Sequence, residues 1–191
     1  MRTLNAVEFL TVDGVMQGLG SPDEDTEGGF THGGWGTGFT EGIDPSDSLG
    51  ATSAYLFGRR TYEKMAAFWP SQPDTNPIAA HLNATSKFVA TRTLTSLDWE
   101  GAEVLGGDLE TSVRQLKAEG EGGITILGSG VLVHQLMQLH LVDGFRLFVH
   151  PLLLGTGKRL FRELPEPRSL HLVGVDSTPL GSIAINYTID A

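Results

Sequence analysis

Apolar and polar positions alternate along the chain in short segments that suit strands. Residues 3–11 alternate well enough to predict a first strand, which ends at the turn-forming pair Asp13-Gly14. A short apolar run predicts a strand over residues 54–57, residues 124–127 look like a buried strand, and further strands are predicted over residues 87–90 and 102–105. A run that is apolar throughout is typical of a strand buried inside a sheet.

Helical spacing fills the segments between these strands. The clearest pattern covers residues 108–119, where Val113 and Leu116 share one face. Asp108 is a suitable cap for its start, and Gly120 a suitable end. Shorter helices are predicted over residues 44–53, 60–67, 78–83 and 131–139. Strands that alternate with helices favour an α/β sheet with helices on its faces.

The last third of the chain has a different pattern. Residues 145–149, 168–175 and 183–189 read as strands separated by turn signals, with no helix long enough for parallel crossovers. We therefore expect antiparallel C-terminal strands added to a mostly parallel central sheet. The length of 191 residues favours one domain, spanning residues 1–191.

A glycine-rich segment interrupts the pattern early in the chain. Residues 13–42 hold ten of the 25 glycines, and a stretch of this kind inside a compact domain is usually functional. We interpret it as a long loop over a pocket. Trp35, in the middle of the tract, suggests a docked anchor, which either pins the loop or lines the site.

Two glycines stand where a predicted strand meets a predicted helix. Gly58 precedes Arg59 and Thr61, and Gly128 opens the sequence Gly128-Ser129-Gly130-Val131. The first N–H groups of a helix and its dipole can hold phosphate, and glycine allows close approach of the ligand to the backbone. Glycines at such junctions are also common packing devices, so the two junctions together carry the phosphate hypothesis.

Charge and composition narrow the choice of ligands. The net charge of −10 argues against nucleic acid. No basic residue lies between Arg2 and Arg59, whereas nine acids do, so we expect phosphates to meet the segment from Arg59 onward. The absence of cysteine excludes disulfides, thiolate metal sites and a cysteine nucleophile. The histidines show no ligand spacing, so no metal is predicted, and a cofactor is the expected carrier of any chemistry.

The same inspection finds no segment that directs the chain to a membrane. No apolar run approaches the length of a membrane span, and no secretory signal is visible near the start. We therefore predict a cytoplasmic protein whose partner is a small-molecule substrate.

Four blocks in the expected order resemble the dihydrofolate reductase-like family. They lie within residues 10–16, 32–35, 57–63 and 126–161, and they include His-Gly-Gly-Trp and Phe-Gly-Arg-Arg-Thr-Tyr-Glu. Within that family the chain is similar to the C-terminal reductase domain of the riboflavin-biosynthesis deaminase/reductase and to its stand-alone relatives. The resemblance implies a mixed, mostly parallel sheet of about eight strands that binds NADPH across its middle.

The resemblance also implies roles for residues of this chain. Gly58, Arg59 and Thr61 would hold the pyrophosphate of NADPH, and Thr91 and Arg92 would recognise its 2′-phosphate. Asp13, Gly14 and Val15 would begin the loop that closes over the nicotinamide, and Trp35 would line the far end of that site. The pyrophosphate would be met from the other side by Gly128, Ser129, Gly130 and Val131.

The chain departs from the family at two points. The second junction is Gly-Ser where the family usually has Gly-Gly, so the β-carbon of Ser129 narrows the approach of a phosphate to the backbone. The acid that grips the pteridine in dihydrofolate reductases has no ungapped counterpart. Asp13, Glu41 and Asp47 are the candidate catalytic residues, as proton-handling or substrate-orienting groups, and proton delivery by water is equally plausible.

The expected activity is hydride transfer from NADPH to a small heterocyclic or carbonyl substrate. One alternative is 5-amino-6-(5-phosphoribosylamino)uracil reductase or dihydrofolate reductase activity; acids at positions 23, 24, 25 and 27 disfavour a ribose phosphate under the loop. Another is a non-catalytic nucleotide-binding relative, since one fold can host either function. By family analogy we expect a homodimer, with residues 145–149 as its surface.

Overall fold

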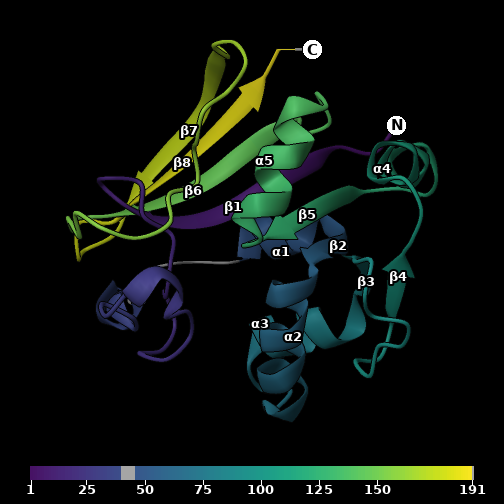
Figure 1. The fold of residues 1–191 in the computed structure, drawn as a ribbon, viewed down its shortest axis with the longest axis horizontal. Coiled ribbons are helices and arrows are strands. Elements are labelled where there is room, and N and C mark those ends of the chain that lie inside the picture. The colour runs from purple at the N-terminus through teal and green to yellow at the C-terminus, as the bar shows by residue number, and fades with distance from the viewer. Residues whose placement is uncertain (40–45, 191) are drawn as a thin grey trace.

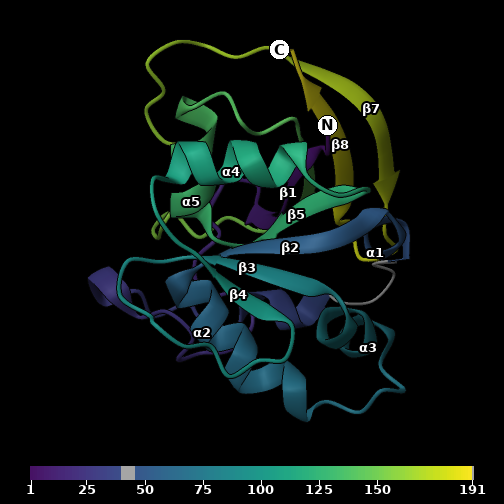
Figure 2. The same cartoon turned by 90° about the vertical axis from the view of Figure 1, so that its right-hand side faces the viewer.

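The computed structural model describes residues 1–39 and 46–190. Its described residues form one eight-stranded sheet in the order β4-β3-β2-β5-β1-β6-β8-β7 (Figures 1 and 2). The strands are β1 (Leu4–Thr11), β2 (Thr52–Gly58), β3 (Ser86–Ala90), β4 (Ala102–Leu105), β5 (Gly123–Leu127), β6 (Gly144–His150), β7 (Leu170–Ser177) and β8 (Ile183–Ile189).

Strand directions follow from the connections. The strands from β1 to β6 run parallel to one another, because a helix or a long segment returns the chain to the same end of the sheet between them. β8 is antiparallel to both β6 and β7, and a tight turn joins it to β7. The expectation of a mostly parallel sheet with antiparallel strands at its C-terminal end is confirmed.

Helices cover both faces of the sheet, as Figure 2 shows. On one face, α4 (Leu109–Ala118) and α5 (Gly130–Gln138) supply Val113, Leu116, Val133 and Leu136 to the largest core cluster. On the other, α2 (Arg59–Phe68) and α3 (Pro77–Ala84) supply residues such as Tyr62 to a second cluster. The short helix α1 (Ser46–Ala51) leads into β2.

The glycine-rich segment is a loop with short helical turns. The 3-10 helices η1 (Glu27–Gly29) and η2 (Trp35–Phe39) lie within it, and a third, η3 (Trp69–Ser71), follows α2. Figure 1 shows this loop as the purple coil beyond the end of β1. Most predicted elements lie within two residues of the observed ones. Of the helix predicted over residues 44–53, residues 44 and 45 lie outside the described residues, and residues 52 and 53 belong to β2.

The proposed dimer surface needs a correction. Residues 145–149 belong to β6, which lies between β1 and β8 inside the sheet. Phe145, Leu147 and Phe148 are buried within the chain itself. An apolar strand is as typical of a sheet interior as of an interface, and here the interior accounts for it. A homodimer stays a prediction, but this strand cannot be its surface.

Candidate functional site

The two glycine junctions meet at one edge of the sheet. β2 and β5 are parallel neighbours with Leu56 opposite Ile126, so Gly58 and Gly128 follow at the same level. The backbone N–H of Gly58 donates a hydrogen bond of 3.0 Å to Oγ of Ser129. Two segments about seventy residues apart in the sequence therefore form one feature, which we call the cradle, consisting of residues 58–61 and 128–131.

Both helices that begin in the cradle have free N-terminal ends. Neither α2 nor α5 has a side-chain cap, and neither has an acidic residue in its first turn. By contrast, Asn76 caps α3 and Asp108 caps α4 through hydrogen bonds to backbone N–H groups. The first N–H groups of a helix lack intrahelical acceptors and carry the positive end of its dipole. The cradle therefore offers two adjacent sites for an anion.

Ser129 explains how the chain tolerates Gly-Ser in place of Gly-Gly. Gly128 and Ser129 both adopt left-handed conformations, with φ of 67° and 65°. Such a conformation is unusual for serine, but here its hydroxyl bonds Gly58 and joins the two junctions. The side chain that narrows the cradle also fixes its geometry.

Thr61 and Arg59 occupy different positions relative to the cradle. Thr61 is half-buried and faces Gly128, since a β-carbon on that glycine would lie 3.4 Å from Cγ2 of Thr61. Arg59 instead directs its guanidinium along α2 to Glu63, with N···O distances of 2.9 and 3.0 Å. A phosphate would have to replace Glu63 as the partner of Arg59. The i, i+4 spacing of this pair was visible in the sequence.

Thr91 and Arg92 lie at the same edge, one strand further out. Gly58 pairs with Ala90 at the end of β3, so the two residues follow directly beside the start of α2. Oγ1 of Thr91 accepts hydrogen bonds from the backbone N–H groups of Thr93 and Leu94, which holds the turn. Arg92 is exposed and forms no ion pair with a described residue. Its guanidinium is therefore free to meet an anion.

The side chain of Asp13 is held by hydrogen bonds from other parts of the chain. Its carboxylate accepts hydrogen bonds from Oγ1 of Thr11 at 2.6 Å and from the backbone N–H groups of Leu154 and Gly155. The bond from Thr11, followed by these backbone bonds, lowers the pKa of Asp13 to about 2. A carboxylate that is ionised at neutral pH and already bonded is poorly suited to donate a proton. Its contacts hold the segment after β6 against the end of β1.

The other two catalytic candidates cannot be placed in the same way. Glu41 lies outside the described residues, and Asp47 lies in α1 but its side chain is outside the described part. Both remain predictions.

The start of the glycine-rich loop reaches the cradle through Met16. Gly14 has a φ of 79°, and Val15 is fully buried, so its side chain is closed to a ligand. Met16 packs so closely on Gly130 that a β-carbon there would collide with its sulfur atom. Val131, in the first turn of α5, exposes 57% of its surface. Gly130 and Val131 therefore lie in the cradle, and Gly14 and Val15 form the turn behind it.

Trp35 anchors the far end of the loop. Its indole N–H donates a hydrogen bond of 2.7 Å to the carbonyl of Gln17, and its ring meets that of His150 edge-on at 5.6 Å. Phe39 contacts the same histidine at 5.2 Å. The expected docked anchor is therefore present, and it lies against the end of β6.

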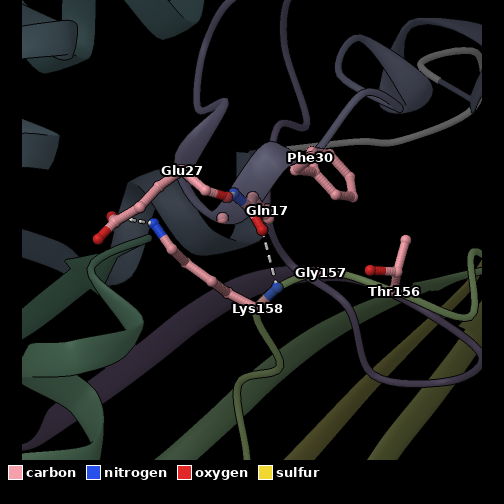
Figure 3. Close-up of a pocket in the computed structure, with 7 residues that line it drawn as sticks. Gln17, Glu27, Phe30, Thr156, Gly157 and Lys158 are labelled. Atoms are coloured by element: carbon pink, nitrogen blue, oxygen red, sulfur yellow. Dashed lines mark hydrogen bonds and ion pairs between the residues drawn. The ribbon is translucent and has the colours of Figure 1, made fainter.

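A group of ion pairs, which we call the loop clamp, fastens the middle of the loop. Nζ of Lys158 bonds Asp25 and Glu27 at 2.7 Å each, and Figure 3 shows the pair with Glu27. Glu27 also bonds Arg60 at the start of α2. Burial lowers the pKa of Lys158, but its bonds to the two carboxylates outweigh this and raise it. The hydrogen bonds that Glu27 accepts from Lys158 and Arg60 lower the pKa of Glu27.

Beside the clamp lies an open depression of about 260 Å³. It is lined by Gln17, Glu27, Gly28, Phe30, Thr156, Gly157 and Lys158, so it lies between the loop and the segment after β6 (Figure 3).

Replacing Lys158 by Met should release the loop. Without the ammonium group, Asp25 and Glu27 lose their shared partner, and we expect amide hydrogen exchange in residues 18–30 to become about tenfold faster. Exchange measured by mass spectrometry tests this. Lys64→Met, which removes an exposed lysine on α2, is the control. Equal exchange in the wild type and in Lys158→Met would show that the clamp does not hold the loop.

Several residues near the site lie within the family blocks, but the sequence assigned them no role. Met16, Lys158, Arg146 and His150 are brought there by tertiary contacts, and only the acids of the loop hinted at a basic partner. In the described part of the chain, no group of three or more histidine, aspartate or glutamate side chains could hold a metal ion. Among the described helices, none is long and apolar enough to cross a bilayer.

Known proteins resemble this chain in sequence and in fold. YyaP of Bacillus subtilis, an uncharacterized protein, is 29% identical over 153 residues, which cover 78% of each chain. YwjB of the same organism, also uncharacterized, is 28% identical over 129 residues, 68% of this chain and 70% of that one.

Two solved structures share the fold. A Shewanella sp. PV-4 protein provisionally assigned to riboflavin biosynthesis has a TM-score of 0.76 at 17% identity, covering 99% of both chains. A pyrimidine reductase-like protein from Corynebacterium diphtheriae has a TM-score of 0.63 at 15% identity, covering 100% of this chain and 92% of its own. The sequence family described as RibD C-terminal domain matches residues 2–183, so the chain belongs to that family.

Proposed function

We propose that this protein is an NADPH-dependent reductase that transfers a hydride to a small, planar heterocyclic or carbonyl substrate. Membership of the RibD C-terminal domain family supports a reductase of the riboflavin-pathway type. One structural observation supports a dinucleotide as the cofactor. The N-termini of two helices, neither with a side-chain cap, meet at the cradle. Two adjacent anion sites suit the two phosphates of a pyrophosphate.

The residues present fit NADPH along the edge of the sheet. The N-terminal ends of α2 and α5 would hold the pyrophosphate, with Thr61 adding a hydroxyl. Thr91 and Arg92, one strand away, would meet the 2′-phosphate. The nicotinamide, when bound, supplies the hydride. The contribution of the chain is to orient that ring and the substrate and to exclude water with the loop from Met16 to Phe39.

Proton delivery in this proposal does not pass through Asp13. A carboxyl with a pKa of about 2, bonded to Thr11, Leu154 and Gly155, has no proton to give at neutral pH. Glu41, Asp47 or water are the remaining candidates.

A second candidate, reduction of the riboflavin-pathway substrate 5-amino-6-(5-phosphoribosylamino)uracil, gains support from the loop clamp. The acids of the loop disfavour a substrate with a ribose phosphate. However, Asp25 and Glu27 are paired with Lys158 and Arg60, so two of those charges are compensated. NADPH consumption with this substrate, compared with dihydrofolate, separates the two activities.

The cofactor proposal is tested with Arg92→Ala. We expect the affinity for NADPH to fall about tenfold and that for NADH to stay unchanged, because only NADPH carries the 2′-phosphate. Calorimetric titration with both cofactors measures this. Arg114→Ala, on α4 and paired with Glu110, is the control. An equal loss of affinity for both cofactors would show that Arg92 does not bind the 2′-phosphate. If the wild type binds neither cofactor, the chain would be a non-catalytic relative of the reductases.

A further inference from the structure

Two buried nitrogen atoms on β6 have no hydrogen-bond partner among the described residues. They are Nε of Arg146 and Nε2 of His150, and His150 exposes only 1% of its surface. Buried polar groups in folded proteins are nearly always paired, and an unpaired one is costly. Two such atoms on one strand, four residues apart, suggest that a ligand completes their hydrogen bonding.

Both side chains lie on the same face of the sheet. Alternate residues of a strand point to one side, so Arg146, Phe148 and His150 share a face. Phe9 of β1 stacks on Phe148 with ring centres 4.7 Å apart, and its ring is nearly parallel to that of His150 at 6.1 Å. Arg146 and Phe9 are only half-buried. We call Phe9, Arg146, Phe148 and His150 the aromatic strip.

The hydrogen bond to Ser182 determines what His150 can offer. Nδ1 of His150 lies 2.8 Å from Oγ of Ser182, which is fully buried. If Nδ1 carried the proton, both the Ser182 hydroxyl proton and Nε2 would lack partners. If the hydroxyl donates to Nδ1, only the Nε2–H is left without one. The second arrangement leaves fewer unpaired groups, so Nε2–H of a neutral imidazole is a donor. Burial lowers the pKa of His150, which also favours the neutral ring.

Arg146 supplies charge to the same strip. Its guanidinium carbon lies 5.3 Å from the centre of the Phe148 ring, and it forms no ion pair with a described residue. Arg146 and Glu8 are the charged residues within β1, β5, β6 and β8, and alternation places Glu8 on the opposite face. The strip therefore presents donors and one positive charge beside aromatic surfaces.

The strip also lies next to the cradle. The carbonyl of Val7 accepts a hydrogen bond of 3.2 Å from the N–H of Gly128, and Phe9 is the next residue of β1 on the same face. The loop covers the other end of the strip through Trp35 and Phe39. Figure 1 shows β1 and β6 side by side, with the purple loop beyond their ends. A molecule on the strip would thus lie between the cradle and the loop.

We propose that Arg146 and His150 are the specificity-determining residues of the substrate site, and that they select a planar anion with an oxygen acceptor. This inference rests on the proposed function, because a reductase substrate must lie beside the cofactor. The ligand ring packs on the half-buried Phe9, a carboxylate or similar anion meets Arg146, and an oxygen atom accepts the Nε2–H of His150. Ser182 is a positioning residue that fixes the tautomer of His150.

The first test measures the tautomer of His150 in the wild-type protein. Long-range ¹H–¹⁵N spectra distinguish protonated from unprotonated ring nitrogens, and the His150 signals are assigned by their loss in His150→Gln. We expect a proton on Nε2 and none on Nδ1, with this preference reduced in Ser182→Ala. A proton on Nδ1 in the wild type would overturn the proposal.

The second test uses three benzene derivatives: benzoate is an anion, benzamide is neutral and keeps the oxygen acceptor, and benzylamine is a cation without one. Benzoate should shift the Nε2 signal of His150 and bind at least about tenfold more tightly than the other two. Arg146→Met should abolish that preference, whereas Arg114→Met on α4 should keep it. No shift, equal binding of the three probes or an equal effect of the two variants would overturn the proposal.

These tests are independent of the cofactor. If NADPH does not bind but benzoate preference holds, the proposed function fails and the anion site stands. If NADPH binds and the probes do not, the reductase proposal stands and the assignment of Arg146 and His150 fails.

Discussion

Gly128→Val should weaken NADPH binding by about 100-fold or more. Gly128 has a φ of 67°, a region that costs a β-branched residue free energy, so the backbone of the cradle would be distorted. A β-carbon there would lie 3.4 Å from Cγ2 of Thr61, and the rest of the valine side chain would occupy the space proposed for a phosphate at the start of α5. Calorimetric titration with NADPH measures the loss.

A matched variant, Gly120→Val, separates the effect of backbone strain on stability from the effect of Gly128→Val on cofactor binding. Gly120 also has a positive φ, 76°, but it follows the end of α4, where its nearest neighbour would be the guanidinium of Arg2. Gly120→Val should lower the melting temperature to a similar degree and leave NADPH affinity unchanged. If Gly128→Val is folded and binds NADPH like the wild type, the cradle is not the pyrophosphate site.

Replacing the buried Glu8 should stabilise the protein. Glu8 exposes 2% of its surface within β1, and its Oε1 has no hydrogen-bond partner in the described part of the chain. It shares its face with Leu4, Ala6 and Leu10 of the largest core cluster. Burial raises the pKa of Glu8 well above its ordinary value of 4.5. We expect Glu8→Leu to raise the free energy of unfolding by about 1–3 kcal/mol at neutral pH, because an unpaired polar group is removed from an apolar site.

The same residue should make stability depend on pH. Because the folded-state pKa lies above the unfolded value, the unfolded carboxyl releases its proton first as the pH rises. The contribution of Glu8 to stability is therefore fully present below about pH 4.5 and is lost as the pH rises through the folded-state pKa. Glu8→Gln should flatten this part of the profile.

Urea unfolding at pH 5, 7 and 9 would measure both effects. Glu119→Gln is the control, since Glu119 is exposed at the end of α4 and accepts a hydrogen bond from the side chain of Gln115. A gain in stability that is the same at every pH in Glu8→Gln would show that Glu8 does not titrate differently in the folded state.

Local patterns in the sequence determined the secondary structure and the family. Residues 108–119 predicted α4, because spacing, cap and glycine stop all act within one helix. The apolar run over residues 124–127 predicted β5 for a similar local reason. The glycines at 58 and 128 predicted the cradle, since a strand–helix junction is also a local feature.

The tertiary structure decided which of these local features meet and how their side chains are used. Ser129 bonds Gly58, and Lys158 bonds the loop acids, across separations that no local pattern encodes. Asp13 matched a family block, but its bonds to Leu154 and Gly155 make it a structural anchor.

Burial was the other property that the sequence left open. Glu8 and His150 carry ordinary polar side chains, and alternation along a strand says which residues share a face but not what covers that face. The helices on one side and the aromatic rings of the loop on the other decide that both are buried. Residues 145–149 show the reverse case, because an apolar strand fits an interface or an interior equally well until its neighbours are known.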